Sequence, residues 1–118
     1  MKEFLKRPIA HRGLHKKNYI IENSLEAFEN AIKNNFAIEC DVVLSKDHEV
    51  IVFHDYSLKR ICNLEKNVAE MHSNELRQIN LLDTKSKIPT LEEMFYQVDS
   101  RVPILIEIKS GFNPIIEE

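Results

Sequence analysis

Glycine is scarce in this chain, which has only two glycines, Gly13 and Gly111, among its 118 residues. Because turns with a positive φ angle favour glycine, Gly13 stands out before any motif is considered. Tryptophan is absent, and the two cysteines are Cys40 and Cys62. Two cysteines are too few for the disulfide framework of a small secreted domain. We therefore expect two reduced thiols, and a disulfide or a metal pair between them is the less favoured alternative.

Long apolar runs and a strong net charge are missing as well. No run approaches the roughly 18 residues of a membrane-spanning helix, and the N-terminus MKEFLKRP lacks the apolar region of a secretory signal. The formal net charge of −3 gives no electrostatic case for binding nucleic acid. With 43% hydrophobic and 30% charged residues, the composition is typical of one soluble, globular domain. We expect a cytoplasmic protein without a transmembrane segment.

Alternating strand and helix patterns predict an α/β fold. Strand patterns occupy four segments: residues 8–10, 37–43, 49–54 and 103–109. Helix patterns occupy residues 24–34 and 91–98, and each follows a predicted capping box, Asn23 with Glu26 and Thr90 with Glu93. Residues 55–89 are less regular, apart from a short helix that Ser73 could cap and that would include Leu76 and Ile79. The order favours parallel βαβ units.

Charged side chains interrupt two of the predicted strands. Because side chains alternate along a strand, Glu39 and Asp41 share the face opposite to Ile38, Cys40 and Val42. In the last strand, one face carries Leu105, Glu107 and Lys109. Each strand thus has an apolar face for helices and a second face that becomes charged toward its C-terminal end. Parallel α/β folds place their functional sites at that end.

The three carboxylates Glu39, Asp41 and Glu107 predict a metal site. An isolated buried carboxylate costs several kcal/mol unless it is paired or bound to a metal ion. Three of them in one cavity would repel one another, and a divalent cation would relieve that repulsion. Ligands that are all oxygen suit a hard cation such as Mg²⁺ or Ca²⁺.

Each signal also has a simpler interpretation. The Glu-x-Asp pair can be the solvated face of an edge strand, and Glu107 with Lys109 can be an exposed salt bridge. The HRG segment at residues 11–13 can be a polar strand end with a turn glycine, and the HD segment at residues 54–55 can be turn chemistry. Their joint occurrence at the ends of apolar strands favours a functional site.

The ordered set of these segments resembles the glycerophosphodiester phosphodiesterase family. The matching segments are IAHRG, IENSLEAFENAI, IECDVVLSKD, VIVFHD, IPTLEEMF and VPILIEIKS. No single one is specific, but their order and spacing fit from Ile9 to Ser110. The resemblance implies the first part of a TIM barrel, (β/α)8, with an irregular insertion after the second barrel strand. It also implies a metal-dependent hydrolase that converts glycerophosphodiesters into sn-glycerol 3-phosphate and an alcohol.

The resemblance further implies a role for each matching residue. The general acid and base would be His11 and His54, and the phosphate-binding groups would be Arg12 and Lys109. The ligands of Mg²⁺ or Ca²⁺ would be Glu39, Asp41 and Glu107, with Glu22 and Asn23 supporting the site. These residue types suit phosphodiester hydrolysis, because the reaction builds negative charge on the phosphate oxygens, which a cation and an arginine stabilise. His48 stands where the family usually has a turn glycine.

The length departs from the family, since a TIM barrel takes roughly 250 residues. We expect residues 1–118 to be the N-terminal part of the domain, with the C-terminal half absent. A separate second half could complete it, or the chain could self-associate through its open sheet edge. The alternative function is a catalytically inactive remnant that binds a metal or a partner. A phospholipase-D-like reaction on sphingomyelin or lysophospholipid ranks behind both, since a secretory signal and a disulfide framework are missing.

Overall fold

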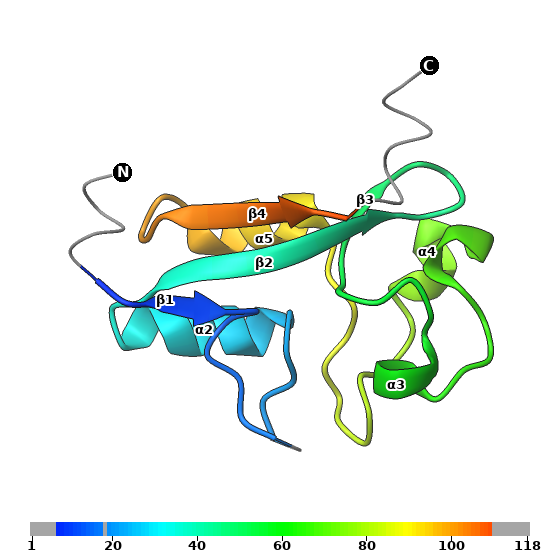
Figure 1. Ribbon diagram of the computed structural model, residues 1–118, viewed down its shortest axis with the longest axis horizontal. Coiled ribbons are helices and arrows are strands. Elements are labelled where there is room, and N and C mark those ends of the chain that lie inside the picture. Colours follow the sequence, from blue (N-terminus) through cyan, green and yellow to red (C-terminus); the bar gives the residue numbers. More distant parts are fainter. Residues whose placement is uncertain (1–6, 18, 110–118) are drawn as a thin grey trace.

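The computed structural model describes residues 7–17 and 19–109. Its four-stranded sheet comprises β1 (Ile9–His11), β2 (Ala37–Leu44), β3 (Val50–Val52) and β4 (Ile104–Ile108). The helices are α2 (Leu25–Lys33), α3 (Lys59–Cys62), the 3-10 turn η1 (Val68–Glu70), α4 (Ser73–Leu76) and α5 (Leu91–Val98). Both of the longer helices, α2 and α5, lie on the same side of the sheet (Figure 1). Among the described residues, no helix combines the length and the apolar character needed to cross a membrane.

Strand β2 is the centre of the sheet. β1 and β4 pair with it in parallel, as predicted, whereas β3 pairs with it antiparallel. The backbone N–H of Ala37 donates to the Pro8 carbonyl, and the Asp41 carbonyl accepts from the N–H of Phe53. The backbone groups of odd-numbered residues in β2 therefore point toward β1 and β3. The N–H of Ile38 donates to Pro103 and faces β4. Because backbone groups alternate between the two edges of a strand, β1 and β3 lie along the same edge of β2. The ends of β1 and β3 therefore flank one stretch of β2.

The main core lies between β2 and the two longer helices. Ile38, Cys40 and Val42 are at most 1% exposed and belong to the same cluster as Phe28 of α2 and Met94 of α5. Each such large side chain stabilises the fold by roughly 1.5–3 kcal/mol. The predicted apolar face of β2 is confirmed, and it leaves Glu39 and Asp41 on the opposite face.

A second core orders the irregular segment between β3 and α5. It is formed by Ile51 and Phe53 together with apolar side chains from this segment, which we call the insertion. Among them are Leu58, Ile61, Val68, Leu76, Leu81 and Ile88. Ile21 and Val43 join it from the loop before α2 and from β2. The insertion therefore has a fixed position beside the charged end of β2.

The N-terminus of α2 differs from its prediction. Ser24, not Asn23, is the N-cap, and its Oγ accepts a hydrogen bond of 3.0 Å from the N–H of Ala27. The predicted Asn23 cap is wrong because Asn23 has a φ angle of +57° and its side chain points to Asp41. The tertiary contact of Asn23 outweighs its local preference for the cap position.

The other two predicted helix starts have different outcomes. The capping box of α5 is confirmed, since Thr90 Oγ1 accepts from the N–H of Glu93 and the Glu93 side chain accepts from the N–H of Thr90. For α4 the cap is His72 rather than Ser73, and the helix ends at Leu76, so Ile79 lies outside it. Ser73 instead donates its hydroxyl to Asp47 at 2.6 Å.

Gly13 allows the segment after β1 to pack closely on α2. Its φ angle is +80°, and an added Cβ would lie 2.8 Å from the Cβ of Ala27 and 2.9 Å from Cδ1 of Phe28. Both the angle and the close approach exclude a side chain. Gly111, the other glycine, lies outside the described residues.

The two cysteines are free thiols, as predicted. Burial raises the pKa of Cys40 to about 12 and that of Cys62 to about 11. Neither is therefore a ready nucleophile or metal ligand.

Candidate active site

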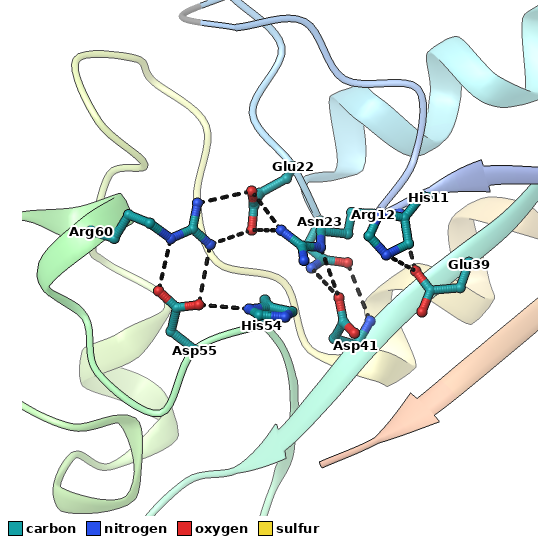
Figure 2. Close-up of polar contacts among 9 residues, drawn as sticks. All are labelled: His11, Arg12, Glu22, Asn23, Glu39, Asp41, His54, Asp55 and Arg60. Carbon is teal, nitrogen blue, oxygen red and sulfur yellow. Dashed lines mark hydrogen bonds and ion pairs between the residues drawn. The ribbon is translucent and has the colours of Figure 1, made fainter.

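Seven of the predicted site residues converge on the face of the sheet opposite to α2 and α5 (Figure 2). His11 ends β1 directly opposite Glu39 of β2, and Asp41 follows on the same face. The remaining residues come from loops: Arg12 follows β1, Glu22 and Asn23 precede α2, and His54 follows β3. The shared edge of β1 and β3 on β2 explains why residues distant in sequence meet here.

Glu39 is buried beside other acidic groups. Its Oε1 accepts from the backbone N–H of Arg12 at 3.2 Å and lies 3.7 Å from Nε2 of His11. Burial raises the pKa of Glu39, and the charges of Asp41 and Glu107 raise it further. The fold thus holds this carboxyl group where its ionised form is unfavourable.

Asp41 is held by hydrogen bonds and by a nearby cation. Asn23 Nδ2 donates to its Oδ2 at 3.1 Å, and Asn23 Oδ1 accepts from the Asp41 backbone N–H at 3.3 Å. Arg12 Nε lies 3.6 Å from the same Oδ2 and is buried without a hydrogen-bond partner. Asn23 therefore fixes the orientation of Asp41.

Glu22 lies between two guanidinium groups. Arg12 Nη1 donates to both of its oxygens at 3.2 and 3.3 Å, and Arg60 donates to them at 3.1 and 2.7 Å. Burial alone would raise the pKa of Glu22, but the two arginines outweigh that effect and lower it. Glu22 is therefore ionised and aligns Arg12.

His54 is paired with the acid that follows it in the chain. Its Nδ1 lies 2.6 Å from Asp55 Oδ1, and Arg60 donates to Asp55 at 2.9 and 3.1 Å. Burial opposes ionisation of Asp55, yet the hydrogen bonds from Arg60 and His54 lower its pKa. Sequence reasoning noted Asp55 only as turn chemistry and missed Arg60, which lies in the irregular segment where no pattern marked it.

Glu107 and Lys109 lie at the end of β4, beside this cluster. Glu107 pairs in register with Asp41, and the backbone N–H of Lys109 donates to the Val42 carbonyl at 3.4 Å. The Glu107 side chain is exposed. Register thus places the third predicted carboxylate next to the first two.

The predicted metal ligands do not form a ready-made metal site. Within residues 7–17 and 19–109, no three His, Cys, Asp or Glu side chains are grouped closely enough to hold an ion. Their chemistry nevertheless fits a hard divalent cation, because Glu39, Asp41 and Glu107 are oxygen donors on adjacent strands. Burial, and after it the charges of Asp41 and Glu107, raise the pKa of Glu39, and a bound cation would offset both effects.

Comparison with known proteins identifies the family. Residues 11–118 match the model of the glycerophosphoryl diester phosphodiesterase family. A lysophospholipase D from Rattus norvegicus is 33% identical, over 98% of this chain and 40% of its own length. The crystal structure of a glycerophosphodiester phosphodiesterase from Thermotoga maritima is 37% identical, with a TM-score of 0.76 over 94% of this chain and 48% of that one.

A third relative is a phosphodiesterase from Oleispira antarctica, solved in complex with the product sn-glycerol-3-phosphate. It is 25% identical, with a TM-score of 0.75 over 90% of this chain and 46% of that one. The chain therefore spans somewhat less than half the length of these three proteins. Its α/β architecture is that of the first part of a TIM barrel, as predicted. From the matched sequence and the shared fold, the chain belongs to the glycerophosphoryl diester phosphodiesterase family.

Proposed function

We propose that this chain carries the site of a metal-dependent hydrolase that splits glycerophosphodiesters into sn-glycerol 3-phosphate and an alcohol. The observation that carries the proposal is the convergence of two histidines, an aligned arginine and the Glu39–Asp41 pair on one face of the sheet. The product bound in the Oleispira antarctica phosphodiesterase supports the same substrate class.

Arg12 is the proposed phosphate-binding group. Glu22 holds its Nη1, and Asp41 lies beside its Nε. Its Nη2 donates no hydrogen bond within the part of the chain that the structure describes, and so remains available to a phosphate oxygen. Lys109 would add a second positive charge at the end of β4. Charge on the non-bridging oxygens rises in the transition state, so fixed cations lower the barrier.

The three carboxylates are the proposed ligands of Mg²⁺ or Ca²⁺. Glu39 and Asp41 would contribute from β2 and Glu107 from β4. When bound, the ion would supply Lewis-acid stabilisation of the phosphoryl oxygens. The hydrogen bond from Asn23 would keep Asp41 in position to bind the ion.

His54 is the proposed general base and His11 the proposed general acid. Asp55 accepts from Nδ1 of His54, which leaves Nε2 for proton transfer and stabilises the imidazolium once it forms. The proton taken would come from water or from the glycerol 2-hydroxyl. His11 is exposed beside Glu39, where it can give a proton to the leaving alcohol.

Release of glycerol 3-phosphate from glycerophosphocholine tests this proposal. We would measure it for the 118-residue chain with Mg²⁺, with Ca²⁺ and with EDTA. We expect metal-dependent turnover that falls at least about 100-fold in His11→Ala and His54→Ala. His15→Ala is the control, since His15 is exposed and has no proposed role. Absence of turnover with every metal would reject the activity for this chain and favour the inactive alternative.

A second candidate is the same cleavage in a lysophospholipid. It is favoured by the likeness to the Rattus norvegicus protein, which is named a lysophospholipase D. The two substrates share the phosphodiester bond and differ by an acyl chain on the glycerol. Comparing kcat/KM for glycerophosphocholine and lysophosphatidylcholine separates them. The cytoplasmic location stays a prediction that localisation of the tagged protein would test.

A further inference from the structure

Helix α3 of the insertion places one arginine between two carboxylates of the site. Arg60 donates two hydrogen bonds to Asp55 and two to Glu22 (Figure 2). Asp55 is the partner of His54, and Glu22 is the partner of Arg12. A single guanidinium group therefore contacts both of the side chains that orient the proposed base and the proposed phosphate-binding arginine.

We propose that Arg60 is a positioning residue that fixes His54 through Asp55 and Arg12 through Glu22. The proposal rests on the proposed function, since it concerns how those two groups are aligned. It assigns a role to the insertion, whose second core holds α3 beside the end of β2.

The link to His54 depends on the geometry of Asp55. Arg60 Nε donates to Oδ2 at 2.9 Å and Arg60 Nη2 donates to Oδ1 at 3.1 Å, which fixes the plane of the carboxylate. Oδ1 also lies 2.6 Å from Nδ1 of His54. An ionised carboxylate only accepts hydrogen bonds, so Nδ1 carries the proton in neutral His54. That tautomer leaves the Nε2 lone pair free to take a proton.

The link to Arg12 depends on Glu22 in the same way. Arg60 donates to both oxygens of Glu22, from a position 38 residues later in the chain. Both oxygens accept in turn from Nη1 of Arg12. Without Arg60, the Glu22 carboxylate would lose its bidentate partner and could rotate together with the Arg12 guanidinium.

Arg101 is a matched control for a role in stability alone. It also donates four hydrogen bonds, two of them to Glu29, and joins α5 to α2. Its side chain is 46% exposed, against 48% for Arg60. The carboxylate partner of Arg101 is the more exposed one, 36% for Glu29 against 11% for Glu22, so loss of Arg101 should cost little stability and loss of Arg60 more. Only the loss of Arg60 should alter His54.

The first experiment measures the tautomer of His54 by ¹⁵N NMR of the imidazole rings, without any substrate. The pH is set well above the ordinary histidine pKa of roughly 6.5. We expect the Nδ1–H form of His54 in the parent chain and in Arg101→Gln. In Arg60→Gln we expect a shift toward the Nε2–H form, and in Arg60→Lys a partial return. An unchanged tautomer in a folded Arg60→Gln chain would overturn the proposal.

A second variant keeps the test decisive if Arg60→Gln does not fold by circular dichroism. Asp55→Asn can donate to Nδ1 and should reverse the tautomer, and Arg60→Lys should show an intermediate ratio. If Asp55→Asn leaves the tautomer unchanged, the proposal fails. These readouts need no activity, so they separate failure of this proposal from failure of the proposed phosphodiesterase function.

Kinetics of glycerophosphocholine cleavage give the second readout. We expect kcat to fall at least about tenfold in Arg60→Gln, because proton transfer at His54 is misaligned, and KM to rise through Arg12. Added guanidinium ion should restore part of kcat in Arg60→Ala but not in His54→Ala. Equal kinetic effects of Arg60→Gln and Arg101→Gln would contradict a positioning role.

Discussion

Among single residues, Glu39 shows how the fold opposes a charge that the site is proposed to use. Its raised pKa means that folding favours the protonated carboxyl, so its contribution to stability is present below the unfolded pKa of roughly 4.3 and is lost as the pH rises through the folded value. At neutral pH the group is a cost to the folded state. A bound cation would make the ionised carboxylate stabilise the folded state instead.

We therefore expect Mg²⁺ or Ca²⁺ to stabilise the chain at neutral pH. At a concentration about 100 times Kd, the free energy of unfolding should increase by about 2.7 kcal/mol. The gain should shrink as the pH falls through the raised pKa of Glu39, because protonation competes with the ion. Thermal unfolding with and without metal at several pH values measures this effect.

Glu39→Gln supplies the control for this prediction. The glutamine keeps an oxygen that can accept from the Arg12 backbone N–H, but it removes the charge. Without metal, the variant should be at least as stable as the parent at neutral pH, and metal should no longer raise its Tm. A metal-induced rise in Tm that is equal in both chains would place the ion elsewhere.

At the scale of elements, the turn between β1 and α2 depends on Gly13. In Gly13→Ala the new Cβ would meet Ala27 and Phe28 at a positive φ angle. We expect a loss of about 2–4 kcal/mol in the free energy of unfolding, from the left-handed backbone and the overpacking together. Denaturation in urea measures it, and a loss below about 1 kcal/mol would contradict the close packing.

His48 provides the opposite case in the turn between β2 and β3. It is exposed and has a φ angle of +64°, which agrees with the turn glycine expected at this position. His48→Gly should therefore be neutral or stabilising by up to about 1 kcal/mol. Opposite changes in the free energy of unfolding for Gly13→Ala and His48→Gly would show that the effects come from backbone strain and not from a general sensitivity of the loops to substitution.

At the scale of the whole molecule, the face of the sheet that carries the site also exposes apolar side chains. Ile9 is 43% exposed and Leu105 is 50% exposed. Register places them beside Ala37 and Glu39, on the side away from α2 and α5. Within the described residues, β1 and β4 each pair only with β2, so each leaves one edge open.

Open edges and exposed apolar side chains together favour association. We expect the purified chain to form dimers or larger assemblies at micromolar concentration, and the double variant Ile9→Thr, Leu105→Gln to shift it toward monomer. Sedimentation velocity over a range of concentrations measures both. Tyr96→Gln is the control, since Tyr96 is exposed on α5, away from this face. A parent chain that stays monomeric throughout would contradict the prediction.

Local patterns in the sequence were sufficient for the sheet strands, both longer helices and the two faces of β2. Strand alternation depends only on neighbouring residues, which is why Ile38 and Cys40 were placed in the core and Glu39 and Asp41 on the other face. The capping box at Thr90 is equally local, and it was predicted correctly. The residues that meet at the site were found from ordered motifs at strand ends, although their catalytic roles remain predictions.

Only the tertiary structure decided which partners these residues have. Asn23 leaves the cap of α2 to reach Asp41, and Arg60 meets Glu22 across 38 residues, because packing of the second core brings the insertion against β2. The antiparallel course of β3 places His54 on the same edge as His11. Such contacts depend on long-range packing, which has no periodic signature in the sequence. The sequence by itself therefore determined the types of residue at the site, and the fold determined how they are paired.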